Sequence, residues 1–315
     1  MEANVKKIVE RVQRGNLWGM KIYVKILRGF VCRFLPKKFL IDQKKENDFV
    51  YTTICSKKSF DMVFASLFSL YKNSSVLPKK IYLVSDGSWN NKDGSNYFKK
   101  YKLPIHFLSW NECASYYEEK WPELLTWAKK QIWGKKMASI LFLSESEKVL
   151  FADPDVLWFN DVLKKEELEN AVFKVSVDNS INYDQNCIKA CKLDILNSRE
   201  AVNCGVVLFK GGLSILNLEA RACIKYESDS PGNFAEQTVF AALDLKHNNR
   251  WKINEITSEI DDLFNYMPFK KNIRYKGMIA RHYLYALKGI YWKVYTKMLL
   301  SNFLSFLFLK LNKAN

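Results

Sequence analysis

Two kinds of segment alternate between residues 49 and 245, and this alternation constrains the fold more than any other feature of the sequence. Runs rich in β-branched and aromatic residues predict strands: FVYTTIC, KKIYLVSDGS, LPIHFLSW, KVLFADPD, KVSVDNS and NCGVVLFKGG. Between them, apolar residues at helical spacing predict helices, as in SFDMVFASLFSLYKN, in residues 112–144 and in residues 233–245. Strands that alternate with helices predict an α/β fold with a mixed, mostly parallel sheet covered on both faces.

Polar residues lie where several of these strands end. Thr53 is near the end of the first strand, Asp86 ends the second, and Asp153 and Asp155 end the fourth. Ligands bind at the carboxyl ends of the strands in such sheets, so these residues are expected to mark the functional edge. The sequence has no Walker motif and no GxGxxG loop, so a phosphate would have to be held in another way.

Asp153 and Asp155 lie close together at the end of a strongly apolar strand. Side chains at positions i and i+2 of a strand face the same side, where two carboxylates repel each other unless a cation lies between them. Mg²⁺ and Mn²⁺ prefer oxygen ligands and commonly share carboxylates with substrate phosphates. The pair therefore predicts a divalent metal site. The alternative is a simple turn at the strand end that Asp153 caps.

Positive charge is concentrated at the two ends of the chain. Residues 1–45 carry a net charge of +9, residues 46–262 carry −3, and residues 263–315 carry +10. Near both ends, Lys and Arg recur at helical spacing among large apolar residues, with Lys293 and Lys297 as an example. Basic amphipathic helices of this kind suit an anionic membrane surface, although they are also compatible with ordinary packing on the body of the protein.

The apolar stretches, the N-terminal residues and the cysteines indicate the cellular compartment. The richest apolar stretch, Met298–Leu309, is too short to span a bilayer, and the N-terminal residues lack the pattern of a signal peptide. The seven cysteines form no CxxC pair, which argues against a disulfide framework or a zinc site. We therefore expect reduced thiols and a cytoplasmic protein, peripheral on the cytoplasmic face of a membrane.

The Asp-x-Asp strand end, followed by Val156-Leu157, resembles that of the nucleotide-sugar glycosyltransferases of GT-A fold. The closest resemblance is to glycosyltransferase family 8, which includes lipopolysaccharide galactosyltransferases and glycogenin, and it covers about residues 49–292. Four further features carry the resemblance: Lys136, 17 residues before Asp153; Asn203-Cys204-Gly205-Val206; Glu236-Gln237-Thr238; and Arg281-His282-Tyr283 with Lys288 and Trp292 beyond. The last motif departs from the family pattern at Tyr285, Gly289 and Ile290.

The resemblance implies a role for each matching residue. Asp153, Asp155 and His282 would hold Mn²⁺ or Mg²⁺. Glu236 and Gln237 would lie beside the donor sugar as the catalytic pair, and Asp178 and Asn203 would face the sugar or the acceptor. The nucleotide-sugar would contact Thr53, Lys136, Pro154 and Lys288.

Each of these assignments has a structural alternative. His282 could be a structural residue, and Asp178 could belong to a turn. Glu236 could cap a helix start. Lys136 could lie on a solvated helix face. His247, in KHNNR, is expected in an exposed loop.

The resemblance implies one GT-A domain, Rossmann-like, over residues 46–292. A basic N-terminal arm (1–45) and a basic amphipathic helix at the membrane interface (293–315) would flank it. The implied activity is metal-dependent sugar transfer from a nucleotide-diphosphate donor to a membrane-associated glycan such as lipopolysaccharide or capsule. Two alternatives remain. A sugar-1-phosphate nucleotidylyltransferase would want a Gly-rich loop, which TTICSKKSF lacks. A non-catalytic polyanion- or membrane-binding protein would use the basic ends; nucleic acid is not expected, because the body is slightly acidic.

Overall fold

The computed structural model describes residues 28–29, 46–101, 103–258, 277–283 and 288–311. The chain divides into two compact units. One unit comprises Phe39–Glu259 and Asn272–His282, and the other comprises Met1–Lys38, Ile260–Lys271 and Tyr283–Asn315. The predicted basic N-terminal arm, residues 1–45, lies almost entirely outside the described residues. The predicted limits of the GT-A domain, after residue 45 and at residue 292, remain predictions.

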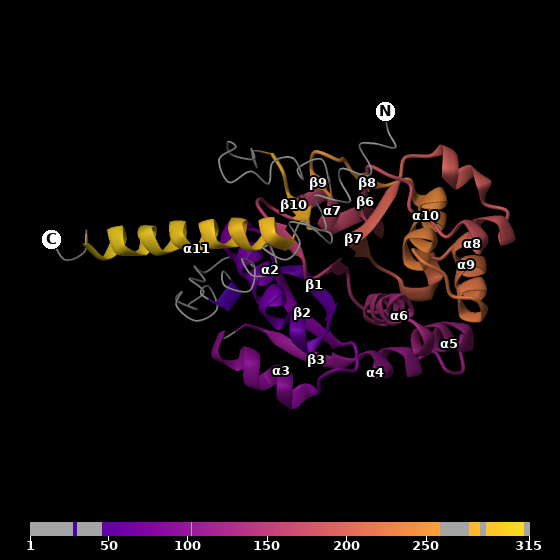
Figure 1. Ribbon diagram of the computed structural model, residues 1–315, viewed down its shortest axis with the longest axis horizontal. Helices are drawn as coiled ribbons and strands as arrows, with labels where there is room; N and C mark the ends of the chain where they lie inside the picture. Colours follow the sequence, from indigo (N-terminus) through magenta and orange to yellow (C-terminus); the bar gives the residue numbers. More distant parts are fainter. Residues whose placement is uncertain (1–27, 30–45, 102, 259–276, 284–287, 312–315) are drawn as a thin grey trace, which may run out of the picture. The chain divides into compact units, whose positions relative to one another are not determined.

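A seven-stranded sheet forms the centre of the larger unit (Figure 1). Its order is β3-β2-β1-β4-β7-β6-β8. The strands are β1 (Glu46–Cys55), β2 (Leu77–Ser85), β3 (Ile105–Ser109), β4 (Val149–Ala152), β6 (Phe173–Val177), β7 (Val202–Phe209) and β8 (Arg250–Trp251). Strand β7 runs antiparallel to both of its neighbours, and the other pairings are parallel. The predicted mixed, mostly parallel sheet is confirmed.

Helices cover both faces of this sheet. The helices described in this unit are α2 (Phe60–Asn73), α3 (Asn91–Phe98), α4 (Trp110–Ser115), α5 (Pro122–Lys130), α6 (Ile132–Ser144), α7 (Lys165–Asn170), α8 (Gln185–Ala190), α9 (Leu218–Asp229) and α10 (Ala235–His247). Strand β1 shows how the faces are divided. The Tyr51 hydroxyl hydrogen-bonds to Ser66 of α2, whereas Ile54 belongs to the apolar cluster that contains Leu141 of α6. Residues an odd number apart in a strand point to opposite faces, so α2 and α6 cover opposite sides.

A second, three-stranded sheet has the order β5-β10-β9. It consists of β5 (Val156–Trp158), β9 (Ile256–Thr257) and β10 (Ala280–His282). Strands β5 and β10 are antiparallel, with His282 opposite Val156. Because β5 begins one residue after Asp155, this pairing brings the chain near residue 280 to the end of β4. The sequence did not predict these strands, since two or three residues are too few for a periodic pattern.

The smaller unit contains the helix α11 (Lys288–Leu311). Near its start, the rings of Tyr283 and Tyr291 pack edge to face, and the Arg28 guanidinium lies 5.9 Å from the centre of the Trp292 ring. Among the described residues, α11 included, no helix combines the length and the apolar character that crossing a bilayer requires.

The structure corrects two of the alternatives drawn from the sequence. His247 is the last residue of α10 and is half-buried, so the expectation of an exposed loop is wrong. Lys136 is 1% exposed, so it does not lie on a solvated helix face. Helix α6 packs between the sheet and α5, and Lys136 lies on a buried side of this helix.

Candidate active site

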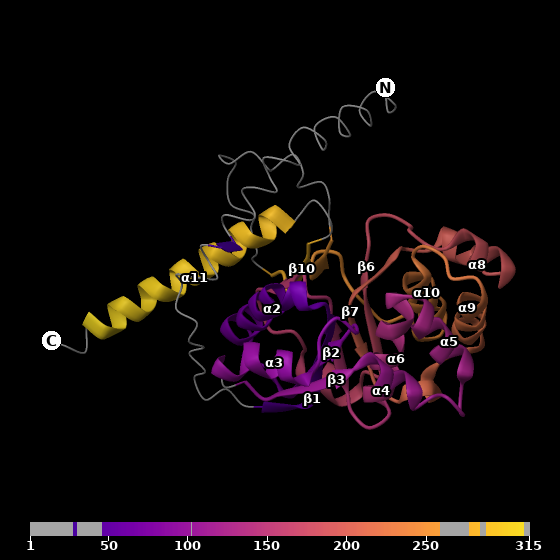
Figure 2. The ribbon, with the colours of Figure 1, turned by 60° about the horizontal axis from the view of Figure 1, so that its bottom comes forward.

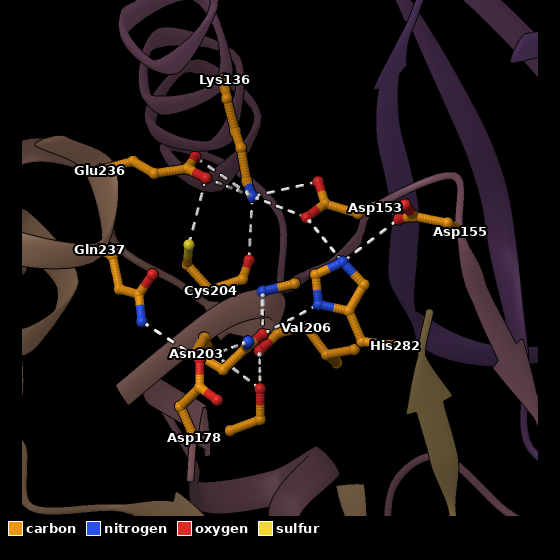
Figure 3. Close-up of polar contacts among 12 residues, drawn as sticks. Lys136, Asp153, Asp155, Asp178, Asn203, Cys204, Val206, Glu236, Gln237 and His282 are labelled. Carbon is orange, nitrogen blue, oxygen red and sulfur yellow. Dashed lines mark hydrogen bonds and ion pairs between the residues drawn. The ribbon is translucent and has the colours of Figure 1, made fainter. Parts of the chain in front are cut away.

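Asp153, Pro154 and Asp155 form a turn between β4 and β5. The Asp153 amide donates to the Gly205 carbonyl at 2.8 Å, which continues the pairing of β4 with β7, and the Val156 amide donates back to the Asp153 carbonyl at 3.2 Å. The two carboxylates therefore converge because the chain turns after the strand, and not because they alternate along it. Both lie at the carboxyl end of β4, as predicted (Figure 3).

His282 meets these two carboxylates from the other sheet. Its Nε2 lies 3.2 Å from Asp155 Oδ1 and 3.6 Å from Asp153 Oδ2. One ligand atom from each of the three side chains can be chosen so that all lie within 4.8 Å of one another. The pairing of β5 with β10 thus joins residues 127 positions apart into one candidate metal site. We call Asp153, Asp155 and His282 the metal triad.

The Asn203 carboxamide determines which nitrogen of His282 carries a proton. Asn203 Oδ1 accepts from the Gly205 amide at 2.8 Å, and Asn203 Nδ2 donates to Asp178 Oδ2 at 3.0 Å, so the orientation of the carboxamide is fixed. The same Oδ1 lies 3.1 Å from His282 Nδ1, which must therefore be the protonated donor. In the neutral ring this leaves the Nε2 lone pair directed at the two carboxylates, as a metal ligand requires.

Gly205 is the residue that lets the ring come this close. A Cβ atom at position 205 would lie 2.1 Å from His282 Nδ1, which is far inside van der Waals contact. The glycine of the Asn203-Cys204-Gly205 motif is thus explained by the approach of His282 to the backbone of β7.

Asp178 anchors the residues behind the ring. Its Oδ2 accepts from Asn203 at 3.0 Å and from Gln237 Nε2 at 3.3 Å, and its Oδ1 accepts from the Ser258 hydroxyl at 2.9 Å. The Gln237 amide also donates to the Val202 carbonyl. These bonds link β6, β7 and α10 into one network that ends at His282.

Lys136 lies beneath the metal triad and forms a buried ion cluster. Its Nζ is 3.1 Å from Asp153 Oδ1, 3.2 Å from Glu236 Oε2 and 2.9 Å from the Cys204 carbonyl. The ammonium also lies 4.4 Å from the centre of the Phe151 ring. Lys136 therefore already offsets part of the repulsion between Asp153 and Asp155, so that repulsion alone does not demand a metal.

The charges of this cluster shift the pKa of its members. Burial lowers the pKa of Lys136, but Asp153 and Glu236 raise it by more, so the ammonium stays charged. Burial raises the pKa of Glu236, against the effect of Lys136. Burial also lowers the pKa of His282, while Asp155 and Asp153 raise it above its usual value. The side chains of Asp153 and Asp155 keep 22% and 15% of their surface exposed, so the triad is open to solvent on one side.

The remaining predicted residues lie around this centre or outside the described part. Thr53 is fully buried on β1, and within the described residues its hydroxyl has no hydrogen-bond partner. Pro154 is half-buried between the two acids. Glu236 and Gln237 lie in the first turn of α10, where neither caps the helix. The side chain of Lys288 is outside the described residues.

Some contributors to the site were not identified from the sequence. Cys204 donates its thiol to Glu236 Oε1 at 3.1 Å, and Ser258 holds Asp178. Ser258 follows β9, a strand of two residues, so the sequence pattern gave no sign of it. Cys204 and Gly205 were within a recognised motif. A glycine inside a strongly apolar strand could have indicated that another group packs closely against the backbone at that position.

Comparisons with known proteins identify the fold. No family model matches the sequence, and no curated protein sequence matches it. Among solved structures, the galactosyltransferase LgtC, in complex with donor and acceptor sugar analogues, aligns at TM-score 0.53 and 11% identity over 80% of this chain and 95% of LgtC. An active-site mutant of LgtC aligns at TM-score 0.50 and 10% identity over 75% of this chain and 87% of that one. The chain therefore has the GT-A fold, as its Asp-x-Asp strand end and accompanying motifs predicted.

Proposed function

We propose that this protein is a metal-dependent hexosyltransferase that moves a sugar from a nucleotide-diphosphate-sugar donor to a glycan acceptor. The observation that carries the proposal is the convergence of the metal triad at the carboxyl end of β4 in a GT-A fold. This edge of an α/β sheet is where ligands bind. The GT-A fold supports the proposal further, because LgtC was solved with donor and acceptor sugar analogues.

The metal triad fits Mn²⁺ or Mg²⁺ in its chemistry. Two carboxylates suit both ions, and an imidazole nitrogen favours Mn²⁺ of the two. Asn203 holds His282 in the tautomer that a ligand needs, and the Asp153 and Asp155 side chains both keep part of their surface exposed to solvent. A divalent ion held there would supply a Lewis acid that stabilises the negative charge developing on the leaving diphosphate.

Lys136 contributes through Asp153. Because its ammonium is buried and remains charged, it fixes the carboxylate of Asp153 in one orientation. These contacts favour a role in shaping the metal triad over direct contact with the nucleotide.

Glu236 and Gln237 are the groups we propose beside the donor sugar. Both are buried, and their contacts with Lys136, Asp178 and Val202 hold them in fixed orientations. A rigid carboxylate and a rigid carboxamide next to a metal-bound diphosphate can align the anomeric carbon for attack. Thr53, Pro154 and Lys288 are proposed to contact the nucleotide.

Asp178 and Asn203 remain candidates for contact with the sugar or the acceptor. The bonds they make support a second task, which is to orient His282. Of the two, Asp178 is half-buried and Asn203 is 4% exposed, so Asp178 is the better placed to reach a substrate.

The acceptor is proposed to be a lipid-linked glycan at the cytoplasmic face of a membrane, such as a lipopolysaccharide or capsule precursor. The basic, apolar helix α11 supports this, because it carries Lys293 and Lys297 and because Leu300 is 44% exposed. Cationic and apolar side chains on one helix bind anionic lipid surfaces.

A ligand screen tests the proposed activity. Thermal unfolding of the full chain is measured with each of several nucleotide-diphosphate sugars, with Mn²⁺, and with both together. A ligand that binds only the folded state raises the melting temperature, and a donor bridged by the ion should do so only when the ion is present. The result would instead indicate a nucleotidylyltransferase if a sugar-1-phosphate and a nucleoside triphosphate stabilise the protein and no nucleotide-diphosphate sugar does.

A further inference from the structure

Helices α8 and α9 lie on the far side of α10 from the strands (Figure 2). Three cysteine thiols from these two helices and the C-terminal cap of α8 meet there. The Sγ atoms of Cys187, Cys191 and Cys223 all lie within 4.8 Å of one another. Cys187 and Cys191 are one helical turn apart, which places them on one face of α8 and its C-terminal cap. Cys223 faces them from α9, 32 residues further along the chain, and this distance is why the sequence spacing alone argued against a zinc site.

A fourth potential ligand lies beside the thiols. Glu227 follows Cys223 by one turn of α9, and its side chain is fully buried. Its Oε2 accepts from the Gly232 amide at 2.8 Å, whereas Oε1 has no hydrogen-bond partner among the described residues. The Cys187 thiol interacts with the same carboxyl group. Because a thiol is only a weak donor, the buried Oε1 is left poorly satisfied, and a cation beside it would satisfy it better.

We propose that Cys187, Cys191, Cys223 and Glu227 form a structural binding site for a thiophilic divalent ion of the Zn²⁺ type. Zn²⁺ takes four ligands in a tetrahedron from thiolate sulfur and carboxylate oxygen, with Zn–S bonds of about 2.3 Å. Sulfurs in such a tetrahedron are about 3.8 Å apart, so the thiols would need to close by only about 1 Å. Three thiolates and one carboxylate carry the same total charge as the common four-cysteine zinc site.

The alternatives account for less of the arrangement. A disulfide would use two of the three thiols and leave the third thiol and the Glu227 oxygen unexplained. Three ordinary core cysteines would not require a buried carboxylate beside them. An ion would use the three thiols, whose Sγ atoms already lie within 4.8 Å of one another, and Glu227 would have to move toward them to complete the set.

The site would act on the candidate active site through the loop between α9 and α10. Glu227 holds the amide of Gly232 in that loop, and the loop leads directly into Glu236 and Gln237. Asp184, which caps α8, donates its amide to Thr238, the next residue on α10. An ion that joins α8 to α9 would therefore stabilise the entry to α10.

Metal content and cobalt spectra test this inference. The full chain is purified without chelators, dialysed against metal-free buffer and analysed for zinc. The bound Zn²⁺ is then exchanged for Co²⁺. Wild type should retain one zinc equivalent that Cys223→Ser loses, and its cobalt form should show intense thiolate-to-cobalt charge-transfer absorption. Cys113→Ser, which removes a buried cysteine on α4, should keep both signals. The charge-transfer band is specific to thiolates, so a cobalt ion in the metal triad cannot produce it.

Several outcomes would overturn the inference. It fails if wild type shows no charge-transfer band, a result that depends on no variant and on no refolding. It fails if Cys223→Ser binds as much zinc as Cys113→Ser does. It also fails if mass spectrometry of the unreduced wild type finds a disulfide among the three cysteines. Glu227→Gln keeps all three thiols and should weaken zinc binding by about 10- to 100-fold, and an unchanged affinity would remove Glu227 from the site.

Discussion

At the scale of single residues, His282 is held by contacts on three sides. Asn203 fixes its tautomer, Gly205 leaves space for its ring, and Asp155 faces its free nitrogen. Two of these contacts come from β7 and the third comes from the turn after β4, so the imidazole has little freedom to rotate. A preorganised ligand of this kind binds a metal without a large cost in side-chain entropy.

Gly205→Ala should displace His282. The new methyl group would occupy a position 2.1 Å from Nδ1, and His282 cannot move away without losing Asn203 or Asp155. We expect the free energy of unfolding to fall by about 1–3 kcal/mol and the affinity for Mn²⁺ to fall with it. Urea denaturation and Mn²⁺ titration measure the two effects. Gly29→Ala, where a methyl group would meet no atom within 4 Å, is the control. Unchanged Mn²⁺ affinity in Gly205→Ala would contradict the placement of His282.

Lys136→Met should be among the most destabilising single changes in the sheet region. It leaves Asp153 and Glu236 close together without the cation that separates them. Removing one partner of a buried ion cluster costs about 3–5 kcal/mol, and urea denaturation should show a loss of that size. Lys129→Met, on the exposed face of α5, should have almost no effect. Adding Glu236→Gln to Lys136→Met should restore part of the lost stability, and a double variant less stable than Lys136→Met would contradict the coupling.

At the scale of elements, the long strands and helices were predictable and the short strands were not. Segments such as Phe60–Asn73 carry enough apolar periodicity to define a helix without any neighbour. By contrast, β5, β9 and β10 exist because they pair with one another, and their two or three residues have no pattern of their own. His282 was therefore recognised only through its motif, whereas its position next to Val156 depends on tertiary pairing.

The same limit explains the misplacement of His247. Its neighbours KHNNR indicated an exposed loop, but α10 continues to His247 and ends against Phe173, with 5.3 Å between the two ring centres. The Asn248 backbone takes a positive φ of 44°, which ends the helix at His247, two residues beyond the predicted end at residue 245. Packing of the last turn, and not local propensity, decided the boundary.

The end of α10 should make stability depend on pH. Burial lowers the pKa of His247 below its usual value, so the folded state disfavours the protonated ring. An unfolded histidine titrates near about pH 6.5, so the unfolded chain binds more protons as the pH falls through that value, and stability is lost. Between about pH 7.5 and pH 5.5, wild type should lose more unfolding free energy than His247→Gln. Equal losses in the two proteins, measured by urea denaturation, would show that His247 is not the cause.

At the scale of the whole molecule, the function depends on residues that are far apart in sequence but close in the fold. The alternation of strands and helices predicted a mostly parallel sheet, and the observed order β3-β2-β1-β4 places Asp153 at its ligand edge. The sequence could not show that Lys136 lies beneath that edge as a buried counter-ion, because a lysine in an amphipathic segment is usually exposed. It could not reveal the cysteine cluster either, since Cys223 is distant along the chain.

The helix α11 provides a test of the proposed membrane acceptor. Deleting Met298–Asn315 removes the most apolar part of the chain beyond the GT-A fold. The truncated protein should bind vesicles containing anionic lipid more weakly in a sedimentation assay, while turnover of a soluble acceptor is largely kept. An unchanged distribution between vesicles and supernatant would count against a role of this helix at a membrane.

The most direct test of the central claim is Asp155→Asn, measured as Mn²⁺-dependent hydrolysis of the nucleotide-sugar that the thermal screen identifies. The change keeps the size of the side chain and removes one charged ligand from the metal triad. We predict that hydrolysis falls by more than about 100-fold and that Mn²⁺ affinity falls with it, while the melting temperature stays close to that of wild type. Asp229→Asn, an exposed change at the end of α9, should behave like wild type. Full activity of Asp155→Asn at the same Mn²⁺ concentration would contradict the claim that Asp153, Asp155 and His282 form the catalytic metal site.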